Sequence, residues 1–150
     1  MNPRQIRILA VAFGLGILAT LGIALSRFST KPVVYVSGTV ALDNSLLTQA
    51  IGIRTVFISV FDASQKGPPF GAARFELSED AKGEFLSFNL TPANLMVMNP
   101  NLQIPQKMLL KARLDTTAKA GPDKPGDLIG FSEAFNSYAA ILINQQVSDR

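Results

Sequence analysis

The chain has no histidine, no cysteine and no tryptophan among its 150 residues. The absence of histidine excludes a Ser-His-Asp triad and an imidazole metal ligand. The absence of cysteine excludes thiol catalysis, Cys-x-x-Cys redox chemistry, thiolate sites for zinc or iron–sulfur clusters, and acylation as a lipoprotein. Catalysis would have to rest on carboxylates, lysine, tyrosine or hydroxyl groups, and no nucleophile motif is present. We therefore expect a protein that is not an enzyme and that carries no resident cofactor.

The chain also lacks a large net charge of either sign once the N-terminal residues are left out of the count. The formal net charge is +3, but Arg4, Arg7, Arg27 and Lys31 all flank one apolar segment. Without these four residues the chain has 10 basic side chains against 11 acidic ones. It has no basic stripe with interleaved aromatic residues, which nucleic-acid binding requires. We expect no nucleic acid among its partners.

A long apolar run lies close to the N-terminus. Residues 8–26 form 19 consecutive positions without a charge. As a helix they would span about 28 Å, close to the thickness of the hydrocarbon core of a bilayer. Basic residues on both sides can reach the two headgroup layers. We expect residues 1–27 to be a transmembrane signal-anchor, followed by a linker over residues 28–32.

The topology of this anchor follows from a small difference in charge. The free α-amino group adds a positive charge before the segment, which favours a cytoplasmic N-terminus. The bulk of the chain would then lie in the periplasm, tethered to the bacterial inner membrane. A cleaved signal peptide is the alternative, because Ala24-Leu25-Ser26 is a small-x-small cleavage site. The apolar run is longer than that of a usual signal peptide, which favours the uncleaved anchor.

Small side chains form a stripe along the predicted anchor helix, at Ala12, Gly16 and Thr20. Their spacing puts them on one helix face, which could pack against another membrane helix. The chain would then be a structural subunit of another inner-membrane complex. Small residues are also common in membrane helices that make no such contact, and this simpler interpretation is favoured.

The remaining residues, 33–147, carry β-type patterns and are followed by a short tail at 148–150. Residues 55–61 (TVFISVF) have apolar side chains on both faces, which is typical of a central strand covered on each side. In residues 107–115 the even positions from Met108 to Leu114 face inward, and Lys111, Arg113 and Asp115 face outward. Further strands are predicted at residues 33–40, 71–77, 84–90 and 139–145.

These segments predict an all-β fold, an immunoglobulin-like antiparallel β-sandwich of six or seven strands preceded by one transmembrane helix. Asp43 or Asn44 can cap one helical turn over Leu46 and Leu47. Residues 91–105 are expected to be irregular and residues 116–127 to form a long loop. The Cys–Trp–Cys core of antibody domains is absent, so the prediction concerns architecture alone.

Several short motifs occur together, in a fixed order. Val36–Asp43 (VSGTVALD) opens the predicted domain, and Thr55–Ile58 (TVFI) is followed by Gly67–Arg74 (GPPFGAAR). Leu95–Met98 (LMVM) is a methionine-containing stretch, and Pro125–Gly130 (PGDLIG) precedes the last apolar strand. In order and spacing, over residues 33–145, the chain resembles the C-terminal immunoglobulin-like domain of the cytochrome c maturation proteins CcmI and CycH.

The resemblance implies a periplasmic, non-catalytic assembly module for c-type cytochrome maturation. In that family the full-length protein belongs to the haem-ligation complex and helps to present apocytochrome c to the haem lyase. The expected partners are therefore components of that complex or apocytochrome c. The family also has a tetratricopeptide-repeat domain before the sandwich, and here one apolar segment runs directly into the sandwich. Either a separate chain supplies the repeats, or the tethered sandwich is used elsewhere.

Two methionines raise a different hypothesis. The thioethers of Met96 and Met98 are soft ligands that could hold Cu(I) or serve as an axial haem ligand. The corresponding function is that of a periplasmic Cu(I)-handling protein. Copper sites of this kind usually recruit histidine or cysteine as well, and the chain has neither. We favour the interpretation that one methionine packs inward and the other lies at the surface, with no metal bound.

The segment Gly126, Asp127, Leu128 and Gly130 is the candidate partner-binding loop. The alternative is a local structural role, in which the Asp127 carboxylate accepts hydrogen bonds from backbone N–H groups and fixes the turn. The two glycines would then provide a positive φ or a close approach between backbones.

Overall fold

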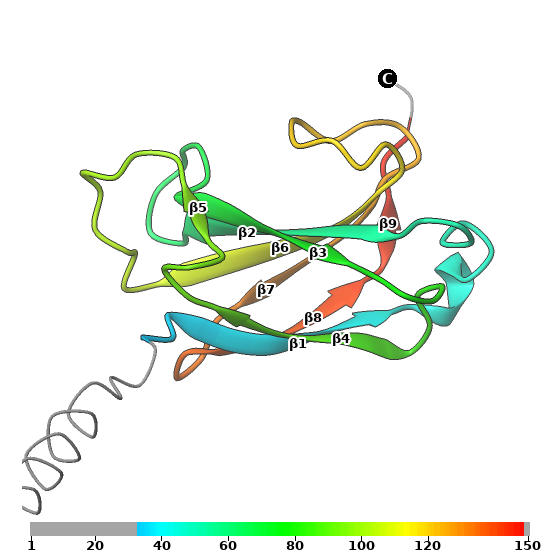
Figure 1. Ribbon diagram of the computed structural model, residues 1–150, viewed down its shortest axis with the longest axis horizontal. Coiled ribbons are helices and arrows are strands. Elements are labelled where there is room, and N and C mark those ends of the chain that lie inside the picture. Colours follow the sequence, from blue (N-terminus) through cyan, green and yellow to red (C-terminus); the bar gives the residue numbers. More distant parts are fainter. Residues whose placement is uncertain (1–32, 149–150) are drawn as a thin grey trace, which may run out of the picture. The chain divides into compact units, whose positions relative to one another are not determined.

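The computed structural model describes residues 33–148, which contain nine strands and one turn of 3-10 helix (Figure 1). The elements are β1 (Val36–Leu42), η1 (Asn44–Leu46), β2 (Thr55–Asp62), β3 (Gly71–Glu76), β4 (Glu84–Leu90), β5 (Met96–Val97), β6 (Met108–Asp115), β7 (Leu128–Glu133), β8 (Tyr138–Ile143) and β9 (Gln145–Gln146).

The strands form two sheets that pack face to face as a sandwich (Figure 1). The smaller sheet has the order β4-β1-β8, and the larger has the order β5-β3-β2-β6-β7-β9. The all-β sandwich predicted from the sequence is confirmed. The prediction of purely antiparallel pairing was wrong for one pair, because β1 and β8 are parallel, from Ser37 opposite Tyr138 to Leu42 opposite Ile143.

The core between the sheets follows the predicted alternation. In β2, Val56, Ile58 and Val60 are fully buried and point to the smaller sheet. In β6 the even-numbered residues from Met108 to Leu114 are buried on the same inner face, as predicted. Their partners across the core come from β1 and β8, where every second side chain is buried, and from Phe88 and Leu90 of β4.

Three elements differ from the sequence prediction or refine it. β7 was not predicted, because Gly130 interrupts its apolar pattern and it directly follows the turn residues Pro125 and Gly126. β5 is a two-residue strand inside the segment expected to be irregular. The helical turn was predicted correctly as η1, with Asp43 as its cap and Ser45 N donating to the Asp43 carboxylate over 2.9 Å.

β7 and β8 are joined by a two-residue hairpin in which Asn136 and Ser137 have φ of +49° and +60°. Behind the hairpin the two strands approach very closely. A Cβ atom on Gly130 would lie 2.1 Å from the carbonyl oxygen of Leu142, so only glycine fits there. The hairpin thus connects β7 of the larger sheet to β8 of the smaller sheet, and the two strands are in contact at Gly130.

The predicted anchor (1–27) and the linker (28–32) lie outside the described residues, as do Ala12, Gly16, Thr20 and residues 149–150 of the predicted tail. Within residues 33–148 no helix has the length and apolar character needed to cross a bilayer.

Candidate functional site

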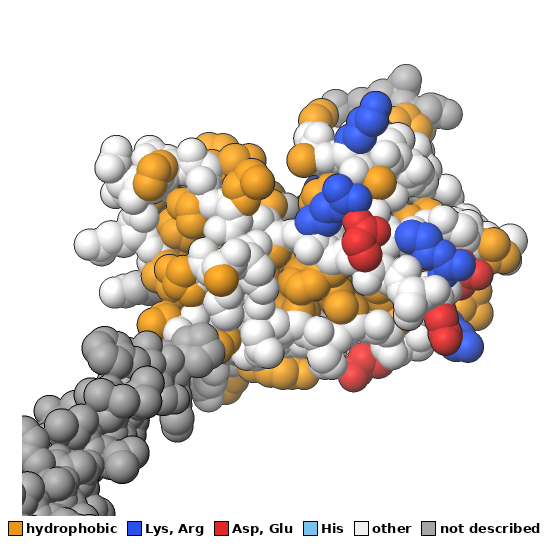
Figure 2. Space-filling view, in the orientation of Figure 1, with side chains coloured by type: hydrophobic (Ala, Val, Ile, Leu, Met, Phe, Trp, Pro, Cys, Tyr) orange, Lys and Arg blue, Asp and Glu red, His pale blue; other side chains and the backbone are white. Residues whose placement is uncertain are grey.

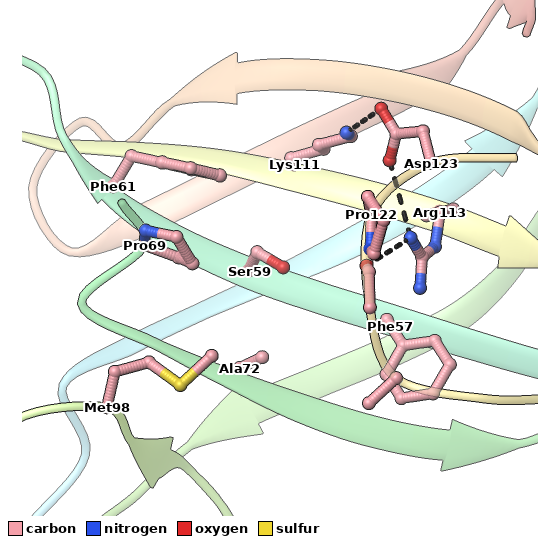
Figure 3. A pocket seen from close by; sticks show the side chains of 12 residues that line it. Phe57, Ser59, Phe61, Pro69, Ala72, Met98, Lys111, Arg113, Pro122 and Asp123 are labelled. Carbon is pink, nitrogen blue, oxygen red and sulfur yellow. Dashed lines mark hydrogen bonds and ion pairs between the residues drawn. The ribbon is translucent and has the colours of Figure 1, made fainter. Parts of the chain in front are cut away.

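A groove on the outer face of the larger sheet is the candidate site (Figure 3). The strand register places Ala72 of β3, Ser59 of β2 and Lys111 of β6 in one row across the sheet. Ala72 and Ser59 are small, whereas Phe57 and Phe61 lie on either side of Ser59 along β2. The small side chains therefore leave a hollow between two aromatic side chains.

Two loops build the walls of this groove and give it a volume of about 440 Å³. One wall consists of Pro69 and Met98, and the other is the segment 120–123 of the loop between β6 and β7. Figure 3 shows Ser59 between these walls, with Pro69 and Met98 on one side and Pro122 on the other. A volume of this size, mostly apolar with a few polar groups, suits a ligand or the side chains of a protein partner.

Arg113 holds the second wall in place. Its guanidinium donates to the carbonyl oxygen of Gly121 at 2.8 Å and to that of Lys119 at 3.4 Å. It also lies over the ring of Phe57, 5.2 Å from the centroid. Arg113 was predicted to face outward, and it does lie on the outer sheet face, but the loop covers it and leaves it only 6% exposed.

Asp115 balances the buried charge of Arg113. Its Oδ2 atom lies 2.8 Å from Nη2 of Arg113, and its Oδ1 atom accepts hydrogen bonds from the backbone N–H and the hydroxyl of Thr117. Burial acts to raise the pKa of Asp115, but the bonds from Thr117 and the charge of Arg113 outweigh it. The pKa therefore lies below its usual value of 3.8.

A second ion pair, between Lys111 and Asp123, lies at the edge of the groove. The Lys111 ammonium pairs with the Asp123 carboxylate, and the same carboxylate lies 3.4 Å from Nη1 of Arg113. Lys111 also lies 5.5 Å from the centroid of the Phe131 ring. The charges beside the groove are thus largely neutralised by one another, and the surface left for a ligand is mainly apolar.

Asp127 anchors the base of the same loop. Its carboxylate accepts hydrogen bonds from the backbone N–H and the hydroxyl of Thr116, both at 3.1 Å, and from the backbone N–H of Lys124 at 2.9 Å. Its Oδ2 atom faces Nε of Arg113 at 3.8 Å. Asp127 is completely buried, so its carboxylate serves the loop that forms the groove wall.

The other members of the predicted partner-binding segment lie beside Asp127. Leu128 and Gly130 are buried in β7, and Gly126, with φ of +91°, is half-buried at the turn. The segment does not line the groove. Direct contact between these four residues and a partner stays a prediction. Gly126 is the one of the four that is not buried.

The placement of the two methionines differs from the favoured interpretation of the sequence, in which one of them packs inward. Met96 is 75% exposed and Met98 is 63% exposed, so neither packs inward as a core residue. Met98 lines the groove, and Met96 lies opposite Ala72 at the sheet edge. No cluster of three acidic side chains that could hold a metal ion occurs among residues 33–148.

The groove was not predicted from the sequence. The apolar side chains on both faces of residues 55–61 indicate a covered strand, but they do not show that Ser59 and Ala72 become neighbours on adjacent strands. A polar residue at the centre of the most apolar strand was the available signal. Its meaning depends on the register between strands, which a single sequence does not provide.

Comparison with known proteins adds no relative. No family model matches the chain, no curated protein is significantly similar to it, and no solved structure matches it significantly. The function is therefore argued from the motifs and from the geometry of the groove.

Proposed function

We propose that this chain is a non-catalytic assembly module for c-type cytochrome maturation, with an immunoglobulin-like domain in the periplasm and a single-pass anchor in the bacterial inner membrane. Its groove takes up an apolar segment of a haem-lyase component or of apocytochrome c. Binding, with no covalent step, is the task that an apolar groove of this size performs.

The observation that carries this proposal is the convergence of the motifs on the groove. Phe57 belongs to the motif Thr55–Ile58, and Pro69 and Ala72 belong to Gly67–Arg74. Met98 ends the methionine-containing stretch and also lines the groove. Segments that resemble the maturation family in sequence thus come together at one surface.

The motif Pro125–Gly130 supports the same surface indirectly, by holding the loop that forms one wall of the groove. It supplies Asp127, which ties Thr116 to Lys124 across the base of the loop. This loop carries Pro122, which forms part of the groove wall. The motif that was predicted to bind a partner directly thus has a positioning role for the residues that would do so.

The proposal is tested by filling the groove. Ser59→Phe places a ring at the centre of the groove, and Thr39→Phe is the matched control, since Thr39 is half-buried on the outer face of β1, the central strand of the other sheet. Cells lacking the chain should lose covalent haem from c-type cytochromes in a stain for haem peroxidase activity. Wild type and Thr39→Phe should restore it, and Ser59→Phe should not. Normal haem attachment in the deletion strain would refute the proposal.

The exposure of both methionines favours a second candidate function, the handling of Cu(I). Met96 lies opposite Ala72 at the sheet edge and Met98 lines the groove together with Ala72, so both thioethers lie near the same edge of the larger sheet. Anaerobic titration with Cu(I) tests this function, with the double variant Met96→Leu, Met98→Leu as control. Equal copper binding by wild type and variant at micromolar concentrations would exclude it.

A further inference from the structure

Exposed apolar side chains gather at one end of the sandwich, which we call the entry end. It is the end at which β1 and β8 begin, where Ser37 pairs with Tyr138, and where β6 begins and β7 ends. Phe135 is 79% exposed there, Val33 is 63% exposed and Leu102 is 55% exposed. Val33 is also the first residue that the structure describes.

The hairpin between β7 and β8 fixes the position of the Phe135 backbone. Backbone hydrogen bonds join Phe135 and Tyr138 in both directions, at 2.8 and 2.9 Å. A further bond, from Ser37 N to the carbonyl oxygen of Ser137, ties the hairpin to the start of β1. The exposed ring is therefore held beside the point at which the chain enters the domain.

Charged side chains are sparse at the entry end. No charged residue occurs between Glu84 and Lys107, a stretch that includes the long loop carrying Leu102. In Figure 2 the Lys, Arg, Asp and Glu side chains lie on the right, over the half that holds η1, and the left half shows hydrophobic and uncharged polar side chains. The charged residues at the entry end are Asp62, Lys66, Lys107 and Glu133. Their two negative and two positive charges balance.

The sequence places this end close to the proposed anchor. Only residues 28–32 separate the proposed anchor from Val33. Five residues span at most about 17 Å even when fully extended. If residues 8–26 cross the bilayer, the entry end cannot leave the region next to the headgroups. Aromatic and aliphatic side chains on a polar scaffold are what bind in that region.

We infer that the entry end docks on the lipid surface of the membrane that holds the anchor, with Phe135 and Leu102 inserted among the headgroups. This inference rests on the proposed tether. Docking by an end, and not by a sheet face, leaves the groove open to the side, parallel to the membrane. The module would then present its groove to partners that lie in or along the same bilayer.

Because the chain has no tryptophan, a single introduced indole reports its own surroundings. Phe135→Trp is made in the full-length chain, which is reconstituted into phosphatidylglycerol–phosphatidylethanolamine vesicles. Ile51→Trp is the matched control, since Ile51 is 66% exposed and follows η1 at the opposite end of β1. Emission is measured with and without lipids brominated along the acyl chain.

The inference predicts blue-shifted emission and quenching by brominated lipid for Phe135→Trp, and unshifted, unquenched emission for Ile51→Trp. Leu102→Trp should behave like Phe135→Trp. If the chain resists alkaline extraction from the vesicles but Phe135→Trp is not quenched, the docking is refuted and the tether stands. If alkali extracts the chain, the tether itself fails.

Discussion

At the scale of single residues, Arg113 shows how a side chain on the outer sheet face becomes part of the interior. The alternation in β6 correctly assigns it to the face away from the core. The loop between β6 and β7 then folds over that face, and Arg113 donates to two loop carbonyl groups. A buried guanidinium requires a nearby anion, and Asp115 supplies it.

The first prediction concerns that anion. Asp115→Asn leaves the charge of Arg113 without its closest partner in a buried site, so the free energy of unfolding should fall by about 3 kcal/mol at pH 7. Urea unfolding measures the loss. Glu79→Gln, at an exposed position, is the control and should change little.

Wild type and Asp115→Asn should also differ in how their free energy of unfolding depends on pH. Because folding lowers the pKa of Asp115 below 3.8, its carboxylate stabilises the fold above about pH 4, and this contribution disappears as the pH falls through the folded-state pKa. The gap in stability between wild type and Asp115→Asn should therefore narrow from pH 7 to pH 3. A gap of constant size would show that the charge of Asp115 contributes nothing.

A further residue-scale prediction concerns Gly130. A methyl group there would collide with the backbone of Leu142, so Gly130→Ala should lower the free energy of unfolding by about 1–3 kcal/mol. Gly67→Ala is the control, because a Cβ on Gly67 meets no atom within 4 Å. Thermal unfolding of the two variants compares them directly, and equal losses would contradict the close contact between β7 and β8.

At the scale of elements, strands with long apolar alternation were predictable and short strands were not. β6 was predicted from its alternation, and β2 was predicted because its apolar side chains occupy both faces, the pattern of a covered central strand. β5 and β9 have two residues each, and their place in the sheet depends on neighbours distant in sequence. The covering loop at 116–127 was predicted as a loop, but its hydrogen bonds to Arg113 were not.

The β7–β8 hairpin offers an element-scale prediction. Ser137 has a left-handed backbone, which costs a non-glycine residue about 1 kcal/mol. Ser137→Gly should therefore raise the free energy of unfolding by roughly that amount. Ser87→Gly, in the middle of β4, should lower it instead, since glycine weakens an extended strand. A loss of stability in both variants would contradict the hairpin geometry.

At the scale of the whole molecule, a candidate function arises where distant segments meet. Three of the motifs noticed in the sequence contribute side chains to one groove, and a fourth holds the loop that forms its wall. The motifs could be found in the sequence, but the groove needed the strand register and the folded loop. The proposed tether then restricts where the groove can act, because the entry end stays near the bilayer.

The central claim, that the groove binds a component of c-type cytochrome maturation, is tested most directly by site-specific crosslinking. A photoreactive amino acid is placed at Ser59 in the full-length chain in native membranes, with Thr39 as the control position. Crosslinked proteins are identified by mass spectrometry. We predict haem-lyase components or apocytochrome c at Ser59 and not at Thr39. Crosslinks at Ser59 that match those at Thr39, or that contain only proteins unrelated to cytochrome maturation, would contradict the claim.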